Sequence, residues 1–169
     1  MTYWEMNILG DEYMKKVELY TDGACSGNPG KGGFGIVLKY NETEKSFSKG
    51  YKFTTNNRME LSAVVTGLSM LKYPCEVTVY SDSKYVVDAI EKGWLFGWMR
   101  KGWKKADGKP AINSDLWKQL VPLLKMHDVS FVWLKGHDGH KYNELCDKLA
   151  TEAYNADEDM LETDVGMPV

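Results

Sequence analysis

The hydrophobic pattern of this chain changes its period near residue 55, and this change constrains the fold more than any other feature. Before it, three β-prone segments at 17–20, 34–38 and 47–53 are separated by glycine-rich or polar stretches. After it, apolar residues recur three and four positions apart over residues 61–68, which is the spacing of an amphipathic helix. We therefore predict an antiparallel meander of three strands followed by a helix.

The glycines and polar residues of this first half predict where its elements begin and end. We expect the first strand to stop at residues 21–23, and the glycine-dense stretch from Gly27 to be a loop leading into the second strand. Asn56 or Asn57 is the predicted N-cap of the helix, which runs to about Leu71.

The second half alternates strands with helices. Its predicted elements are a strand at 76–80, a capped helix ending near Glu91, a basic loop with a helical fragment at 92–112, a helix capped by Asn113 or Ser114, a strand at 129–134 and a helix at 142–154. Strands joined through helices are normally parallel. The whole pattern therefore predicts an α/β domain with a mixed sheet.

The length of 169 residues matches one domain. No apolar run approaches the roughly 18 residues that span a bilayer, and the first residues lack the layout of a signal peptide, so we expect a cytoplasmic protein. The three cysteines lack the spacing of a zinc site, and we interpret them as reduced packing residues. We expect residues 1–14 to be an extension, residues 15–154 to be the domain, and residues 155–169 to be a mobile acidic tail with too few apolar residues to dock.

The net charge of −3 hides an uneven distribution. Eight acids and no Lys or Arg lie in residues 1–13 and 154–169, which leaves 21 basic residues against 16 acidic ones in between. A basic body fits a polyanionic ligand. The densest basic stretch is 100–105, which also carries Trp103.

Four acids lie at positions where strands and helices begin or end: Asp22, Glu60, Asp82 and Asp147. Each has an ordinary structural interpretation as a turn residue, a helix cap or a solvated side chain. However, if the strands before Asp22 and Asp82 are parallel neighbours, both acids lie at the same edge of the sheet, where open α/β sheets bind ligands. Gathered carboxylates repel one another unless a cation holds them, and oxygen ligands favour Mg²⁺ or Mn²⁺. This predicts a divalent-metal site for phosphoryl transfer.

Five motifs then occur in order over about residues 15–153: Tyr20–Gly30 (YTDGACSGNPG), Thr55–Leu61 (TNNRMEL), Tyr80–Ser83 (YSDS), Lys135–His140 (KGHDGH) and Asn143–Asp147 (NELCD). Together they resemble the successive motifs of bacterial type I ribonuclease H. The resemblance implies the ribonuclease H-like fold, in which a five-stranded mixed sheet (strands 1–3 antiparallel; strands 1, 4 and 5 parallel) carries helices on both faces.

The resemblance also implies an activity. Members of this family are endonucleases that cleave the RNA strand of RNA–DNA hybrids with two Mg²⁺ ions, for which Mn²⁺ is a possible substitute, and they leave 5′-phosphate and 3′-hydroxyl ends. By the resemblance, Asp22 bridges the two ions, Asp82 and Asp147 lie on the side of the attacking water, and Glu60 lies on the other side. His137 matches the mobile histidine that moves protons or helps the product leave. The implied partner is the hybrid duplex; we expect no membrane and no obligate protein partner, and a monomer.

The same resemblance implies substrate contacts in three regions. Amides and backbone groups face the minor groove, Thr55 and Asn113 grip a phosphate of the DNA strand, and a basic protrusion meets further phosphates. The implied contact residues are Cys25, Asn28, Thr55, Asn56, Asn57, Lys84, Trp94, Lys101, Lys104, Lys105 and Asn113. Lys84 stands where many relatives have Gln. Trp98 and Trp103 are expected to be partly structural.

Two alternative functions were weighed against this one. A non-catalytic hybrid-binding module would have lost an acid, and none of the four is missing. An integrase-like or transposase-like strand-transfer domain would carry flanking DNA-binding domains and a different third acid, for which we expect no room in 169 residues.

Overall fold

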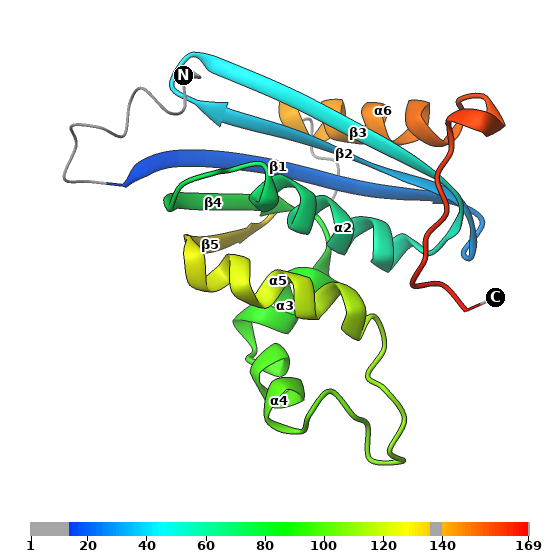
Figure 1. Cartoon of the computed structure of the whole chain (residues 1–169). Helices are drawn as coiled ribbons and strands as arrows, with labels where there is room; N and C mark the ends of the chain where they lie inside the picture. The colour runs from blue at the N-terminus through cyan, green and yellow to red at the C-terminus, as the bar shows by residue number, and fades with distance from the viewer. Residues whose placement is uncertain (1–13, 136–139, 169) are drawn as a thin grey trace.

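Five strands form one mixed sheet in the order β3-β2-β1-β4-β5 (Figure 1). The computed structural model describes residues 14–135 and 140–168. The strands are β1 (Lys15–Ser26), β2 (Gly30–Tyr40), β3 (Thr43–Thr54), β4 (Cys75–Ser81) and β5 (Asp128–Trp133). Strands β1, β2 and β3 pair antiparallel, whereas β1 with β4 and β4 with β5 pair parallel. The predicted mixed sheet is confirmed.

Helices cover both faces of this sheet. The helices are α2 (Asn56–Ser69), α3 (Lys84–Glu91), α4 (Trp94–Arg100), α5 (Ser114–Met126) and α6 (Lys141–Tyr154), with a short 3₁₀ turn at Glu158–Met160. Helix α6 lies on one face, and α2, α3 and α5 lie on the other (Figure 1). Among the described residues, no helix combines the length and the apolar character needed to cross a bilayer.

The alternation of side chains along β1 divides the apolar residues between the two faces. Leu19 points into the larger core, which also contains Phe34, Met59 and Trp117. Tyr20, its neighbour, belongs to a smaller cluster with Val37 and Cys146 under α6. One strand is therefore buried on both sides, and this holds the segment that carries Asp22 rigidly in place.

The predicted end of the first strand and the predicted glycine loop are both wrong. Strand β1 continues past Asp22 to Ser26, and β2 already begins at Gly30. The two strands stay paired along this length, from Glu18 opposite Lys39 to Ser26 opposite Lys31. Asp22 therefore lies inside a paired strand.

The glycines of β2 are needed because α6 packs directly on the strand. A Cβ added at Gly35 would lie 2.3 Å from the backbone oxygen of Cys146, and one at Gly33 would lie 2.6 Å from that of Ala150. Glycine thus marks a close helix–strand contact here, as it often does within strands. This contact sets how closely α6, which carries Asp147, approaches the sheet.

The cap of α2 differs from the sequence prediction, whereas α3 begins with a capped first turn as expected. Thr55 caps α2, and its side-chain oxygen accepts a hydrogen bond from the Arg58 N–H. Ser83 caps α3 by accepting from the Val86 N–H. Asp82 is therefore not needed as a cap, which removes one ordinary structural explanation for this acid.

The C-terminal segment, residues 155–168, is docked, which corrects the expectation that it has too few apolar residues to dock. Leu161 is only 5% exposed. The backbone of Glu162 pairs with β3, because its N–H donates to the Gly50 oxygen (2.9 Å) and its oxygen accepts from the Lys52 N–H (2.9 Å). A buried leucine and a short stretch of strand pairing thus attach the segment to β3, and Asp164 adds an ion pair with Arg58.

Candidate active site

Three carboxylates meet where the pairing of β1 with β4 ends, two of them buried and the third, Asp82, half-buried. Asp22 comes from β1, Glu60 from the start of α2, and Asp82 follows β4. Each offers an oxygen within 4.8 Å of the others. Asp22 is 2% exposed and Glu60 is 4% exposed.

The register of the sheet explains why Asp22 and Asp82 meet. Tyr20 on β1 pairs with Tyr80 on β4 in the parallel ladder. Each aspartate lies two residues beyond this pair in the same chain direction, so the two side chains lie next to each other. The expected juxtaposition is observed, even though β1 continues past Asp22.

Glu60 reaches the site because α2 begins directly against β1. The Gly23 N–H donates to Glu60 Oε1 (3.0 Å). A Cβ added at Gly23 would lie 2.5 Å from the Glu60 backbone nitrogen and 2.7 Å from the Met59 carbonyl carbon. Glycine at position 23 therefore allows the contact that places Glu60.

Gly23→Ala is expected to damage both stability and the site, because an added methyl group must push α2 away from β1. Overpacking of this kind typically costs about 1–3 kcal/mol in the free energy of unfolding. Divalent-metal affinity should fall as well, since Glu60 moves with α2. Urea unfolding and calorimetric Mg²⁺ titration check both effects. Gly97→Ala is the matched control, because the added Cβ at Gly97 would meet nothing within 4 Å.

The electrostatics of this cluster call for a cation. Burial, followed by repulsion from Asp82, raises the pKa of Asp22 to about 8. Burial and repulsion from Asp22 and Asp82 raise the pKa of Glu60 well above its usual range. Asp22 Oδ2 and Glu60 Oε2 are buried and have no hydrogen-bond partner among the described residues. Carboxylate oxygens are the ligands that Mg²⁺ and Mn²⁺ prefer, so these residues fit such an ion.

The fourth predicted acid, Asp147, lies on α6 beside this cluster. Repulsion from Asp147 contributes to the raised pKa of Asp22. Among residues 14–135 and 140–168, the set of carboxylates that meet within 4.8 Å consists of the other three acids. His137 and its neighbour Asp138 lie outside the described residues.

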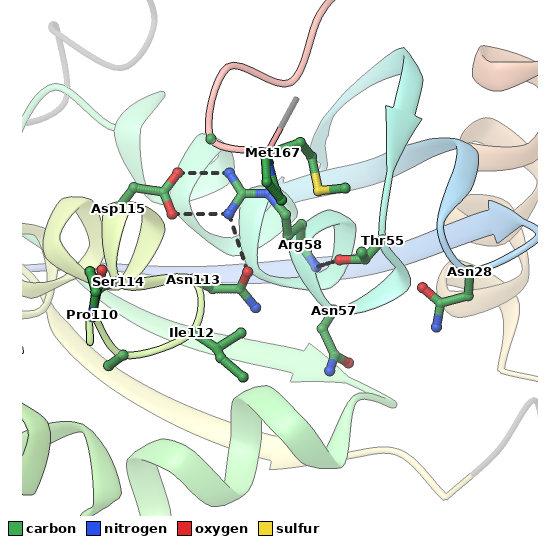
Figure 2. A pocket seen from close by; sticks show the side chains of 13 residues that line it. Asn28, Thr55, Asn57, Arg58, Pro110, Ile112, Asn113, Ser114, Asp115 and Met167 are labelled. Carbon is green, nitrogen blue, oxygen red and sulfur yellow. Dashed lines mark hydrogen bonds and ion pairs between the residues drawn. The ribbon is translucent and has the colours of Figure 1, made fainter. Parts of the chain in front are cut away.

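Several predicted substrate residues line one cavity. Asn28, Thr55, Asn57 and Asn113 border a space of about 740 Å³, together with parts of residues 110–115 and 166–168 (Figure 2). The N–H of Asn56 is occupied, because it donates to Asn28 Oδ1 (3.1 Å). This hydrogen bond connects the turn between β1 and β2, which contains Asn28, to the start of α2.

The other predicted contacts lie elsewhere. The thiol of Cys25 contacts the Gly30 and Thr54 oxygens at 3.6 and 3.5 Å. Lys84 Nζ lies 4.8 Å from the centre of the Trp133 ring, and the Trp133 N–H donates to the backbone oxygen of Asp82 (3.3 Å). Lys84 is therefore connected to the acid cluster through Trp133, which the sequence reasoning did not identify.

The basic protrusion consists of α4 and the loop that follows it. Lys101, Lys104 and Lys105 are exposed there, and Trp94 is 46% exposed. Trp98 and Trp103 pack against the core, with the Trp98 ring 5.5 Å from that of Trp117. The expectation that these two tryptophans are partly structural is confirmed.

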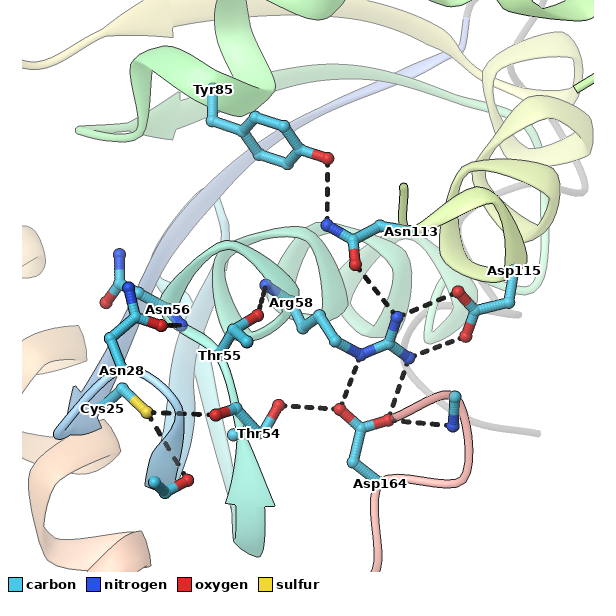
Figure 3. Close-up of polar contacts among 12 residues, drawn as sticks. Cys25, Asn28, Thr54, Thr55, Asn56, Arg58, Tyr85, Asn113, Asp115 and Asp164 are labelled. Atoms are coloured by element: carbon cyan, nitrogen blue, oxygen red, sulfur yellow. Dashed lines mark hydrogen bonds and ion pairs between the residues drawn. The ribbon is translucent and has the colours of Figure 1, made fainter. Parts of the chain in front are cut away.

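Sequence reasoning also missed an ion-pair network beside the cavity. Arg58 is buried and binds two carboxylates, Asp115 on α5 and Asp164 in the C-terminal segment (Figure 3). Arg58 stands within the TNNRMEL motif, but no sequence signal connects it with an acid 106 positions later.

Comparisons with known proteins agree with this geometry. The RNase H family model matches residues 14–155. A curated ribonuclease H from Novosphingobium aromaticivorans is 58% identical over 140 residues, which cover 83% of this chain and 97% of that protein.

Solved structures give the same result. The type 1 ribonuclease H LC9-RNase H1 superimposes with a TM-score of 0.76 at 31% identity, covering 86% of this chain and 75% of that one. A foamy viral protease-reverse transcriptase in complex with an RNA/DNA hybrid has a TM-score of 0.69 at 25% identity, covering 86% of this chain and 20% of that one. Since the family model spans the residues that build the sheet and all four acids, this chain belongs to the ribonuclease H family.

Proposed function

We propose that this ribonuclease H hydrolyses the RNA strand of RNA–DNA hybrids at Asp22, Glu60, Asp82 and Asp147, leaving 5′-phosphate and 3′-hydroxyl ends. The observation that carries the proposal is the meeting of three carboxylates, two of them buried, within 4.8 Å in a chain of this family. The related reverse transcriptase that has been solved with an RNA/DNA hybrid supports the same substrate class.

Asp22, Glu60, Asp82 and Asp147 would hold two Mg²⁺ ions. Bound there, such ions would lower the pKa of an attacking water and stabilise the charge on the leaving 3′-oxygen. The chain itself holds Asp22 and Glu60 in buried positions on β1 and at the start of α2. Glu60 Oε1 is fixed by the Gly23 N–H, which leaves Oε2 for an ion or for a 2′-hydroxyl, the group that distinguishes RNA from DNA.

His137 is proposed as the proton carrier, because an imidazole titrates near neutral pH. General acid or base groups typically contribute about 10²–10⁴-fold to the rate. Replacement of His137 should therefore slow turnover without abolishing it.

The cavity beside α2 is proposed to receive a phosphate of the DNA strand. It borders the first turn of α2, which contains no acidic residue, and helix N-termini favour anions. Thr55 and Asn113 contribute neutral donors, a hydroxyl and an amide. This contact orients the duplex, so the opposite strand presents its phosphate to the acids.

The three lysines of the basic protrusion are expected to contribute binding but not chemistry. Replacing Lys101, Lys104 and Lys105 together by Ala should raise KM for the hybrid and leave kcat nearly unchanged. The slope of log Kd against log salt should fall by about 0.9 per lost phosphate contact. The control replaces three other exposed lysines by Ala and so removes the same charge outside the basic protrusion: Lys45, Lys72 and Lys125. An unchanged salt slope in the first variant would remove the protrusion from the binding surface.

A panel of duplexes tests the proposed substrate class. RNA–DNA hybrid, duplex RNA and duplex DNA of one sequence are incubated with the protein, with and without Mg²⁺. Cleavage is expected only of the hybrid, only in its RNA strand and only with the ion. Equal cleavage of duplex RNA would contradict the proposal.

A further inference from the structure

The guanidinium of Arg58 is saturated by protein contacts. Asp115 accepts from Nη1 (2.9 Å) and Nη2 (2.7 Å), and Asp164 accepts from Nε (2.7 Å) and Nη2 (2.9 Å) (Figure 3). The remaining Nη1 proton goes to Asn113 Oδ1 (3.2 Å). A guanidinium has five N–H donors, so none is left for a phosphate. Arg58 lines the cavity, but it acts as part of the scaffold.

This network fixes the orientation of the Asn113 amide. Because Arg58 only donates, it must face the oxygen of the amide, and the NH₂ group then points the other way. There it donates to the Tyr85 hydroxyl (3.0 Å), which leaves one N–H available to the cavity. The backbone at Asn113 has a φ of 60°. Asn113 occupies the N-cap position of α5, but its side chain makes no capping bond, so it is oriented for the cavity instead.

Asp164 holds this arrangement from the C-terminal segment. Its carboxylate accepts from the Thr54 hydroxyl (2.7 Å) and from the Gly166 N–H (3.3 Å), in addition to Arg58. Gly166 and the two residues after it form a wall of the same cavity. One carboxylate therefore ties the segment, the end of β3 and Arg58 together.

We propose that Asp164 is a positioning residue for nucleic-acid binding: it holds Arg58 so that the amide of Asn113 faces a DNA-strand phosphate in the cavity. This inference rests on the proposed function of that cavity. It assigns to the acidic segment a role opposite to the one that its charge predicts, because removing this negative charge should weaken the binding of a polyanion.

The first test separates positioning from charge. Asp164→Ala is expected to raise KM for the hybrid, and Kd measured by fluorescence anisotropy, about tenfold, the equivalent of one misplaced hydrogen bond to a charged group, with kcat within about twofold. Glu158→Ala removes the same charge from the same segment, where the Glu158 carboxylate forms an exposed ion pair with Lys31. Its KM should stay equal to or below that of the parent. An unchanged KM in Asp164→Ala would overturn the proposal.

The second test is a double-mutant cycle with Asn113→Ala. If Asp164 acts through Asn113, then Asp164→Ala adds no further increase in Kd when Asn113 is already Ala, whereas it still lowers the Tm. An equal increase in both backgrounds would show that Asp164 acts elsewhere and would overturn the proposal. Asp164→Asn, which keeps the shape and part of the hydrogen bonding, should give an intermediate Kd and guards against misfolding of the alanine variant.

The same measurements distinguish this inference from the proposed function. A parent protein that cleaves the hybrid while Asn113→Ala keeps the parental Kd would overturn the positioning role and leave the hydrolysis intact. A parent that binds the hybrid but does not cleave its RNA strand in Mg²⁺ would overturn the proposed function, and the increase in Kd of Asp164→Ala would then still test the positioning role.

Discussion

Asp22→Asn is expected to lower hydrolysis of the hybrid by about three orders of magnitude or more, because the variant loses one of the proposed metal ligands and with it several kcal/mol of transition-state stabilisation. The fold should survive, since Asn has nearly the same shape as Asp and β1 is held by pairing on both sides. Asp128→Asn, at an exposed position at the start of β5, is the control and should keep full activity. Turnover within tenfold of the parent would contradict the assignment.

In the absence of metal, Asp22→Asn should also be at least as stable as the parent at neutral pH. In the folded parent, burial and repulsion from Asp82 raise the pKa of Asp22 to about 8, above the value of about 3.9 expected in the unfolded chain. The folded state therefore binds more protons between these values, and stability falls as the pH rises from about 4 to 8. Asn cannot ionise, so the variant should lose less stability over this interval. Thermal melts in chelator across this pH range measure the difference.

Arg58→Met is expected to cost about 3–5 kcal/mol in the free energy of unfolding, since it leaves buried carboxylate charge without its partner. The side chain of Arg58 is 4% exposed and that of Asp164 is 9% exposed. Lys49→Met is the matched control, because its ion pair with Glu162 is 34% and 53% exposed and such pairs contribute about 0–1 kcal/mol. Urea unfolding with comparable m-values measures both changes. A loss below 1 kcal/mol for Arg58→Met would contradict the account of the network.

The same network predicts an acid dependence. Hydrogen bonds from Arg58 lower the pKa of Asp115, and at Asp164 bonds from Arg58 and Thr54 outweigh burial and lower the pKa as well. Stability from these groups is therefore present above the unfolded pKa of about 4 and is lost as the pH falls below it. The difference in the free energy of unfolding between the parent and Arg58→Met should therefore become smaller as the pH falls below about 4.

The docked segment changes what truncation is expected to do. From its five acids, the sequence predicts that deletion of residues 155–169 maintains or improves hybrid affinity at low salt. With Asp164 bound to Arg58, deletion instead removes a buried ion pair and a wall of the cavity. Loss of stability and weaker binding are now expected.

Local patterns in the sequence predicted much of the fold. The alternation of strands and helices has a short-range physical cause, and the position of Asp82 after a strand follows from it. The pairing partners of a strand have no such local cause. This explains the error at Gly30, because β2 contains glycines that let α6 pack closely on it, and a strand rich in glycine has the composition of a loop. The C-terminal segment offers Leu161 as its one buried apolar side chain, and its other anchors, the backbone of Glu162 and the carboxylate of Asp164, have partners far away in the sequence. No local pattern predicts such contacts.

In the site too, local patterns predict some features, and contacts between distant positions are not predicted. The meeting of Asp22 and Asp82 could be predicted because a parallel register places them together, and the motifs supply Glu60. The role of Asp147 stays a prediction. The bond from Arg58 to Asp164 joins positions 106 apart through a contact that no periodicity encodes. Asn113 illustrates the limit: its sequence context indicates a helix cap, whereas its side chain binds Arg58 and Tyr85.

The central claim is that these carboxylates direct a water molecule, and not the 2′-hydroxyl of the substrate, at the RNA phosphate. Cleavage of a hybrid in ¹⁸O-enriched water with Mg²⁺, followed by mass spectrometry of the RNA fragments, tests it directly. The account predicts one ¹⁸O in each newly formed 5′-phosphate and a 3′-hydroxyl on the other fragment, with both products absent from Asp22→Asn. Fragments ending in a 2′,3′-cyclic phosphate and a 5′-hydroxyl would contradict it.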